Sequence, residues 1–105
     1  MSGPSVQPRF VPVTMDIPML GVRRGDMLAV VPSDTYRGDA IYMLTLEGTP
    51  MPVRAHTSRT GDVVVAALHP GGGAATMTRT QFCDLLLGQV LATCKVLDPS
   101  LLGSL

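Results

Sequence analysis

The dipeptide Gly-Asp occurs three times in this chain, at residues 25–26, 38–39 and 61–62, and a run of β-forming residues follows each copy. Gly and Asp are frequent turn residues, because Gly adopts positive φ without strain and Asp bonds to nearby backbone amides. The Val, Ile and other β-branched residues in the runs favour extended backbone. The chain therefore contains the same local pattern three times, a turn followed by a strand. This repetition predicts a protein built from β-sheet.

Other segments continue this pattern along the chain. The predicted strands span residues 10–13, 27–31, 39–46, 51–56, 62–68 and 85–97. Pro12 lacks an amide donor, so the first strand is predicted at an edge of the sheet. Glu47-Gly48 predicts a tight turn that pairs two of these strands as a hairpin. About six or seven short strands with frequent turns indicate an all-β fold, a small partly open barrel or sandwich.

The C-terminal part contains the segments with competing interpretations. Residues 85–97 predict a strand because they contain β-branched side chains, although their three consecutive leucines also suit a helix. Residues 78–84 predict one helical turn capped by Thr78 or Thr80. The glycine-rich residues 69–75 are interpreted as a mobile loop, because no helix follows them at the spacing that a phosphate site needs.

Length and composition limit the organisation and the functional class. A chain of 105 residues with 46% hydrophobic content suits one compact domain, predicted over residues 10–98 between a loose segment at 1–9 and a tail at 99–105. Eight basic and eight acidic side chains balance, so direct binding to nucleic acid is not expected. The sequence shows no apolar run of membrane-spanning length and no signal peptide, and a cytoplasmic location is expected.

The cysteines do not predict a metal site or a nucleophile. Cys83 and Cys94 lack the paired spacing of zinc ligands and are interpreted as packing residues. Neither has a nearby sequence partner that could act as a base. The sequence therefore predicts no metal, no organic cofactor and no small-molecule substrate.

The segment Val13-Thr-Met-Asp-Ile-Pro-Met-Leu-Gly-Val-Arg-Arg-Gly-Asp-Met-Leu-Ala-Val30 resembles the signature of the LexA-like self-cleaving domain. This domain occurs in the SOS repressor, in UmuD-like mutagenesis proteins and in many phage repressors. Its signature contains Gly-Asp-Ser-Met-x-Pro, a hydrophobic position and a second Gly-Asp before a hydrophobic strand. Asp16 matches the first Asp, and Gly25 with Asp26 matches the second pair. The resemblance continues through later motifs and implies the β fold of these domains.

The resemblance also implies a reaction in which a neutral, buried Lys activates a Ser hydroxyl. In this chain Ile17 stands at the Ser position, and Arg54, in the run Pro52-Val-Arg-Ala-His56, stands at the Lys position. Ile17 has no hydroxyl, and the guanidinium of Arg54 stays protonated and cannot act as the base. Leu20 also replaces the expected Pro. We therefore expect a catalytically inactive domain.

Two other functions stay open at this point. Thr14 lies near the nucleophile position but three residues early, which changes its strand face and reach. Ser58, His56 and Asp62 could form a triad, and Lys95 is the single lysine. A peptidase or hydrolase with a relocated catalytic group is therefore one alternative, and a structural β module is another.

The resemblance implies association, because these domains form dimers to which the C-terminal strand contributes. We expect partner binding by one face of the last strand, formed by Leu91, Thr93, Lys95 and Leu97. The alternate residues are expected to face the core: Val90, Ala92, Cys94 and Val96. The predicted partner is a second copy of the chain or a repressor of similar fold.

Overall fold

The computed structural model describes residues 7–69 and 71–97 and has one antiparallel sheet of seven strands in the order β1-β2-β7-β3-β4-β5-β6. The strands are β1 (Arg9–Pro12), β2 (Met27–Pro32), β3 (Ala40–Leu46), β4 (Thr49–Thr57), β5 (Val63–Ala67), β6 (Ala74–Met77) and β7 (Leu86–Cys94). A 3₁₀ helix, η1 (Pro18–Leu20), and an α-helix, α1 (Arg79–Leu85), complete the described elements. The two outer strands do not pair with each other, so the predicted all-β, partly open fold is confirmed.

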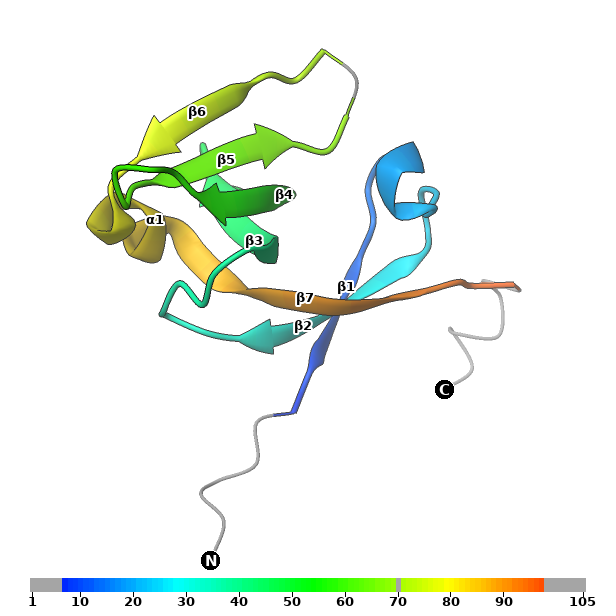
Figure 1. Ribbon diagram of the computed structural model, residues 1–105. Coiled ribbons are helices and arrows are strands. Elements are labelled where there is room, and N and C mark those ends of the chain that lie inside the picture. Colours follow the sequence, from blue (N-terminus) through cyan, green and yellow to red (C-terminus); the bar gives the residue numbers. More distant parts are fainter. Residues whose placement is uncertain (1–6, 70, 98–105) are drawn as a thin grey trace, which may run out of the picture.

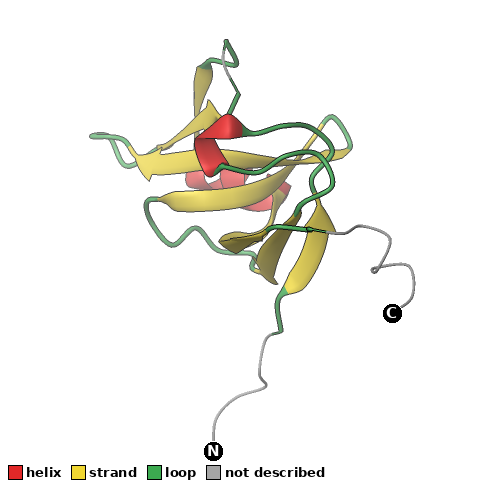
Figure 2. Ribbon diagram, turned by 90° about the vertical axis from the view of Figure 1, so that its right-hand side faces the viewer, coloured by secondary structure: helices red, strands yellow, loops and turns green. Residues whose placement is uncertain are grey.

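The long strand β7 connects two halves of the sheet (Figure 1). It pairs with β2 on one side and with β3 on the other. The group β3 to β6 lies with α1 in one half, and β1, β2 and η1 lie in the other (Figures 1 and 2). Within the described residues, no helix is long and apolar enough to cross a membrane.

The predicted turns occur where the Gly-Asp pairs stand. Gly25, Gly38 and Gly61 have φ values of 96°, 95° and 90°, and each stands two positions before the first residue of a strand. Glu47 and Gly48 also have positive φ and join β3 to β4 as the predicted hairpin. Local turn chemistry therefore sets the starts of β2, β3, β4 and β5.

Two hydrophobic clusters pack on opposite faces of β3. Tyr42 belongs to the first, which we call the aromatic core, and its neighbour Met43 belongs to the second, the aliphatic core. In the aromatic core, the ring of Phe82 from α1 meets the rings of Tyr36 and Tyr42 edge-on, with centroids 5.2 and 5.1 Å apart. The aliphatic core contains Val13, Ile17, Val22, Leu28, Val30, Met43 and Leu68. The segment that carries β1, η1 and β2 therefore covers the face of β3 opposite α1.

The predicted alternation along the last strand is wrong, because β-bulges interrupt β7. Ala29 pairs with Ala92 while Val30 pairs with Val90, which leaves Leu91 as the extra residue. As a result Val90 packs against the aliphatic core, but Ala92 is exposed rather than buried. Residues 90, 92, 94 and 96 therefore do not form one core face.

Other predictions have mixed outcomes. The helical turn is confirmed as α1, with Thr78 as its N-cap and Gln81 completing a capping box. Pro12 lies on an edge strand, as predicted. The loop predicted at residues 69–75 is too long, since β6 begins inside it at Ala74. The tail at 99–105 and most of the segment at 1–9 lie outside the described residues.

Candidate functional site

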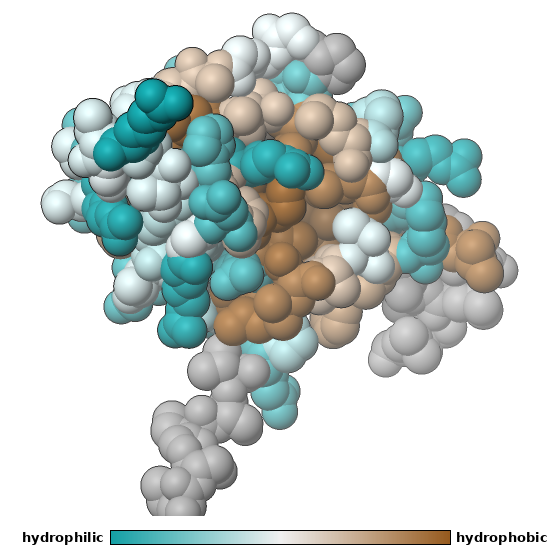
Figure 3. Space-filling model, in the orientation of Figure 1, coloured by the Kyte–Doolittle hydropathy of each residue, from teal (hydrophilic) through white to brown (hydrophobic). Residues whose placement is uncertain are grey.

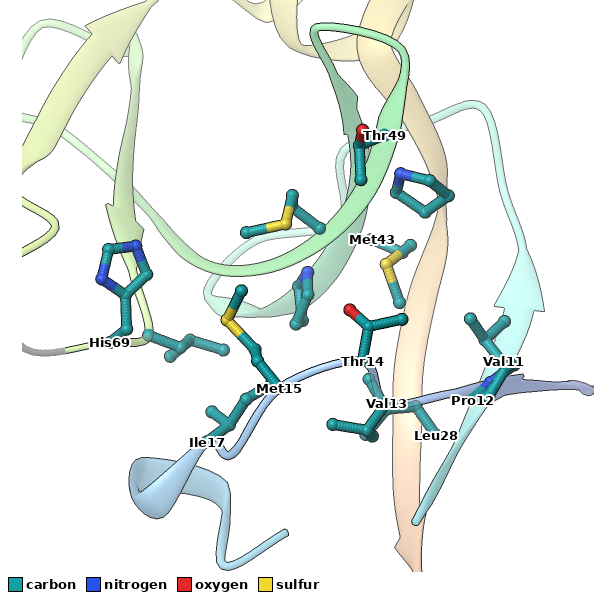
Figure 4. Close-up of a pocket in the computed structure, with 14 residues that line it drawn as sticks. Val11, Pro12, Val13, Thr14, Met15, Ile17, Leu28, Met43, Thr49 and His69 are labelled. Atoms are coloured by element: carbon teal, nitrogen blue, oxygen red, sulfur yellow. The ribbon is translucent and has the colours of Figure 1, made fainter. Parts of the chain in front are cut away.

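A cleft with a volume of about 290 Å³ lies between the segment that follows β1 and the β3–β4 hairpin. Figure 4 shows this arrangement, and Figure 3 shows apolar residues gathered in a band across this face of the molecule. Residues 11–15 and Ile17 line one side, and Met43 with residues 49–52 lines the other. Leu28, Leu68 and His69 complete the lining. We refer to this feature as the cleft.

Backbone hydrogen bonds hold the first wall of the cleft in place. The amide of Val13 donates to the carbonyl oxygen of Asp26 at 2.8 Å, and the amide of Gly25 donates to the carbonyl oxygen of Val13 at 3.0 Å. The amide of Ile17 donates to the carbonyl oxygen of Val22 at 2.9 Å. The wall is therefore tied at both ends to the turn that precedes β2.

The second wall is the part of β4 that extends past β5. Strand β5 pairs only with residues 53–57 of β4, so residues 49–52 form a free edge. Pro50 and Pro52 stand on this edge and lack amide donors. A bound chain would find few backbone donors here, and apolar side-chain contact is the interaction that this wall offers.

The lining is rich in methionine and poor in polar groups. Met15, Met43 and Met51 contribute thioether side chains, as Figure 4 shows for Met15 and Met43. The side chains of Thr14, Thr49 and His69 are the polar ones in the lining. Methionine is flexible and polarisable, so such surfaces adapt to differently shaped apolar partners.

The two positions matched to the catalytic dyad line different hollows. Ile17 is buried in the aliphatic core, with 3% of its surface exposed, and lines the cleft. Arg54 is exposed on β4 and lines a second hollow, together with Asp39, Ile41 and His56. The cleft lining does not include Arg54.

Among the described residues, no hydrogen bond joins the side chains of His56, Ser58 and Asp62. Thr14 is exposed in the cleft, and Figure 4 shows His69 away from it, on the far side of Met15. The hydroxyl oxygens of Ser58 and Thr60 are hydrogen-bonded at 2.9 Å. The Asp62 atom that Ser58 contacts is the carbonyl oxygen, which accepts from the Ser58 amide, and not the carboxylate.

The residues predicted to bind a partner are exposed at the end of β7. Leu91 is 59% exposed and Leu97 is 96% exposed, and Thr93 is exposed as well. The Lys95 ammonium donates to the carbonyl oxygen of Gly21 and lies 3.7 Å from a carboxylate oxygen of Asp26. Lys95 therefore links the end of β7 to the turn beside the cleft, a role that its position in the sequence did not indicate.

Asp26 is the buried acidic side chain next to this link. Its carboxylate accepts hydrogen bonds from the amides of Arg23 and Val96, at 2.9 and 3.1 Å. These backbone donors lower the pKa of Asp26, with the Arg23 amide as the largest cause. Asp26 is therefore ionised at neutral pH, and its two backbone hydrogen bonds fix the turn.

The sequence interpretation missed the residues that give the cleft its character, namely Met15, Met51 and the two prolines beside Met51. The signal available was the run Pro50-Met-Pro52, which is unusual for a central strand, in a chain with seven methionines. Across the described residues, no three His, Cys, Asp or Glu side chains gather as metal ligands would. No protein-family model matches the chain, and neither a curated protein nor a solved structure does.

Proposed function

We propose that this chain is a catalytically inactive, LexA-like domain that acts by protein association, and that its cleft binds an apolar segment of the partner. The observation that carries the proposal is the lining of the cleft, where methionine, proline, valine and leucine side chains surround three polar ones. A concave apolar surface with a few polar groups is typical of a binding site. The partner is a second copy or a repressor of similar fold.

The chemistry of the walls supports binding rather than catalysis. Ile17 supplies no hydroxyl to the cleft, and the Arg54 guanidinium belongs to the second hollow. Acyl transfer needs a nucleophile and a base within hydrogen-bond reach, together with donors for the developing oxyanion. Among the described residues, no hydrogen bond joins the Thr14 hydroxyl to a base, whereas the apolar lining suits the side chains of Leu, Val, Ile or Phe.

Two methionines provide a matched pair for testing the cleft. Met15 lines the cleft and is 41% exposed, and Met19, four positions later, is 58% exposed but does not line it. A library of random peptides displayed on phage would be selected on the immobilised chain. The affinity of the enriched peptides would then be measured by isothermal titration calorimetry for wild type, Met15→Lys and Met19→Lys.

The proposal expects the enriched peptides to be apolar and to bind Met15→Lys with a Kd at least about tenfold weaker than wild type. Met19→Lys is expected to bind them like wild type. Equal losses in the two variants would remove the cleft as the binding site. Cleavage of the peptides by the wild-type chain would contradict the assignment as an inactive domain, and sedimentation analysis of the chain alone would separate self-association from a different partner.

A further inference from the structure

The outermost strand β6 has a free edge within the described part of the chain. The amide of Ala67 in β5 donates to the carbonyl oxygen of Gly73 at 3.0 Å. In an antiparallel pair every second residue of a strand is hydrogen-bonded to its partner strand, so this bond fixes which residues of β6 face β5. In this alternation Ala75 and Met77 direct their backbone groups towards β5. Ala74 and Thr76 therefore direct their amides and carbonyl oxygens away from the sheet, where a further strand would bind.

The two outer edges of the sheet differ in how they are protected. On β1 the amide of Val13 bonds to Asp26, so in the same alternation Phe10 and Pro12 face outward. Pro12 has no amide, and this interrupts any added ladder. The β6 strand, Ala74 to Met77, contains no proline and no charged side chain. Edge strands without a proline or a charged side chain readily pair with another chain.

A hollow of about 470 Å³ lies beside this free edge and is lined by Thr76, Met77, Gln81, Asp84 and Leu85. Thr76, whose backbone groups face away from β5, lines the hollow with Met77, and no residue of β5 does. Figure 1 shows β6 at the outside of the sheet with α1 beside its end. The hollow, which we call the β6 hollow, is therefore open to a chain that pairs with β6.

The lining of the β6 hollow favours one kind of side chain. Met77 and Leu85 are half-buried and offer apolar contact. Asp84 is exposed on α1 and forms no ion pair among the described residues. A long aliphatic side chain that ends in a positive charge satisfies both features, because its stem packs on apolar surface while its charged end remains near the carboxylate. Lys and Arg have this chemistry.

We propose that β6 is a docking site for an extended peptide, which adds to the sheet as an eighth strand and places a Lys or Arg side chain in the β6 hollow beside Asp84. Backbone hydrogen bonds to Ala74 and Thr76 supply affinity, and the hollow supplies the preference for a basic residue. This site lies apart from the cleft, and none of its residues lines the cleft.

The test uses two synthetic peptides that differ at one position, acetyl-Ser-Thr-Val-Lys-Val-Thr-Ser-amide and its Glu counterpart. Each would be titrated into the full chain labelled with ¹⁵N, and amide chemical shifts would be followed by NMR. The proposal expects the Lys peptide to move the amide signals of residues 74–77 and α1, and to bind with a Kd at least about tenfold below that of the Glu peptide.

Two matched pairs of variants separate the backbone and the charge contributions. Ala74→Pro removes an outward amide at the first residue of β6 without removing a bond to β5, and Ala74→Val keeps that amide. Asp84→Lys reverses the charge in the β6 hollow, and Asp34→Lys makes the same change at another exposed position. Ala74→Pro is expected to bind the Lys peptide about tenfold more weakly than Ala74→Val does. Asp84→Lys is likewise expected to bind it about tenfold more weakly than Asp34→Lys does.

Three results would overturn the proposal. Shift changes confined to residues that line the cleft would move the peptide to the cleft. Equal binding of the Lys and Glu peptides would remove the role of Asp84. A dimer of the free chain that Ala74→Pro dissociates and Ala74→Val does not would assign the β6 edge to a second copy of the chain instead of a basic peptide.

Discussion

The carboxylate of Asp26 accepts a hydrogen bond from the amide of Val96 at 3.1 Å, although the two residues stand 70 positions apart. The same carboxylate accepts from the amide of Arg23, inside the turn that leads into β2. One buried side chain therefore joins the end of β7 to the turn that supports the first wall of the cleft. The geometry of the cleft depends on this junction as well as on the residues that line it.

The ionisation of Asp26 predicts how stability depends on pH. The backbone donors hold the folded pKa below the ordinary value of 3.8. A carboxyl group with a lowered folded pKa stabilises the fold above its unfolded pKa, and this contribution is lost as the pH falls through the folded pKa. The resistance of the wild type to urea is therefore expected to fall as the pH is lowered below about 5 and through the folded pKa of Asp26.

Asp26→Asn isolates that contribution. The variant is expected to have a lower urea midpoint than wild type at about pH 7 and a smaller change of midpoint in the acid range. Asp34→Asn alters an exposed carboxylate and serves as the control, with a pH profile like that of wild type. Identical acid profiles for Asp26→Asn and wild type would show that Asp26 does not link folding to protonation.

Tyr42 combines complete burial with two hydrogen bonds from its hydroxyl. The hydroxyl donates to the carbonyl oxygen of Gly38 at 2.7 Å and accepts from the amide of Arg37 at 2.9 Å. Tyr42→Phe keeps the ring but leaves both backbone groups without this partner, so the free energy of unfolding is expected to fall by about 1–3 kcal/mol. Chemical denaturation checks the value, and a loss below that of Tyr36→Phe, whose hydroxyl is hydrogen-bonded to Thr57, would contradict it.

Burial also raises the pKa of Tyr42 above its ordinary value of 10.0. Because the fold favours the neutral phenol, this contribution to stability is present below pH 10.0 and is lost as the pH rises above it. Spectrophotometric titration at 295 nm is the measurement, since ionised tyrosine absorbs there. The titration curve of the wild type is expected to contain a component at high pH that is missing from the curve of Tyr42→Phe. Curves that coincide after division by the number of tyrosines would contradict this.

Gly88 lies where β7 passes close to the backbone of β2. A Cβ atom at this position would lie 2.4 Å from the carbonyl oxygen of Val31 and 2.7 Å from Cγ1 of Val30. Gly88→Ala is therefore expected to destabilise the fold by about 1–3 kcal/mol or more, since the backbone of β2 would have to move. Gln89→Ala, at the next position of β7, is the control, and thermal unfolding at neutral pH compares the two. A stable Gly88→Ala would mean that β7 and β2 separate easily.

Features that depend on local chemistry were predictable from the sequence. The Gly-Asp pairs, the Glu47-Gly48 turn and the Thr78 cap each involve residues a few positions apart, and all three occur in the structure. The edge position of the first strand followed from the missing amide of Pro12. These signals indicate the class of the fold because turns and caps depend on residues that are close in the sequence and not on which strands pair.

Features that depend on pairing between distant strands were not predictable. Leu91 is the extra residue of a bulge only because β7 pairs with β2, and a single-strand pattern contains no sign of it. Ala74 and Ala75, the first two residues of β6, follow three glycines and are predicted as loop, but they pair with Ala66 and Val65 of β5. The cleft forms because β4 extends past the end of β5 and because the segment after β1 packs opposite that extension. Both features depend on contacts between residues that are distant in the sequence.

The exposed leucines at the end of β7 provide a test of the predicted partner face. Leu91 and Leu97 have large exposed fractions and make no large contribution to either core. Replacing both with Glu is expected to weaken association with a second copy or a repressor while leaving the urea midpoint unchanged. Sedimentation equilibrium measures the association, and Leu87→Glu, at another exposed leucine of β7, is the control. Unchanged association of the double variant would remove this face from the interface.

Placing the Ser and Lys of the LexA-like dyad at the two matched positions tests the proposed lack of catalytic activity. Ile17→Ser with Arg54→Lys supplies a hydroxyl and an amine, but the first position is buried in the aliphatic core and the second lines a different hollow. The double variant is therefore expected to remain unlabelled by a fluorophosphonate probe, because a Ser without an adjacent base is a weak nucleophile. Circular dichroism would first establish that the variant folds, and a serine hydrolase in the same reaction would establish that the probe is active. Labelling that depends on both substitutions would show that the two positions approach each other in solution and that this fold can support a reactive Ser.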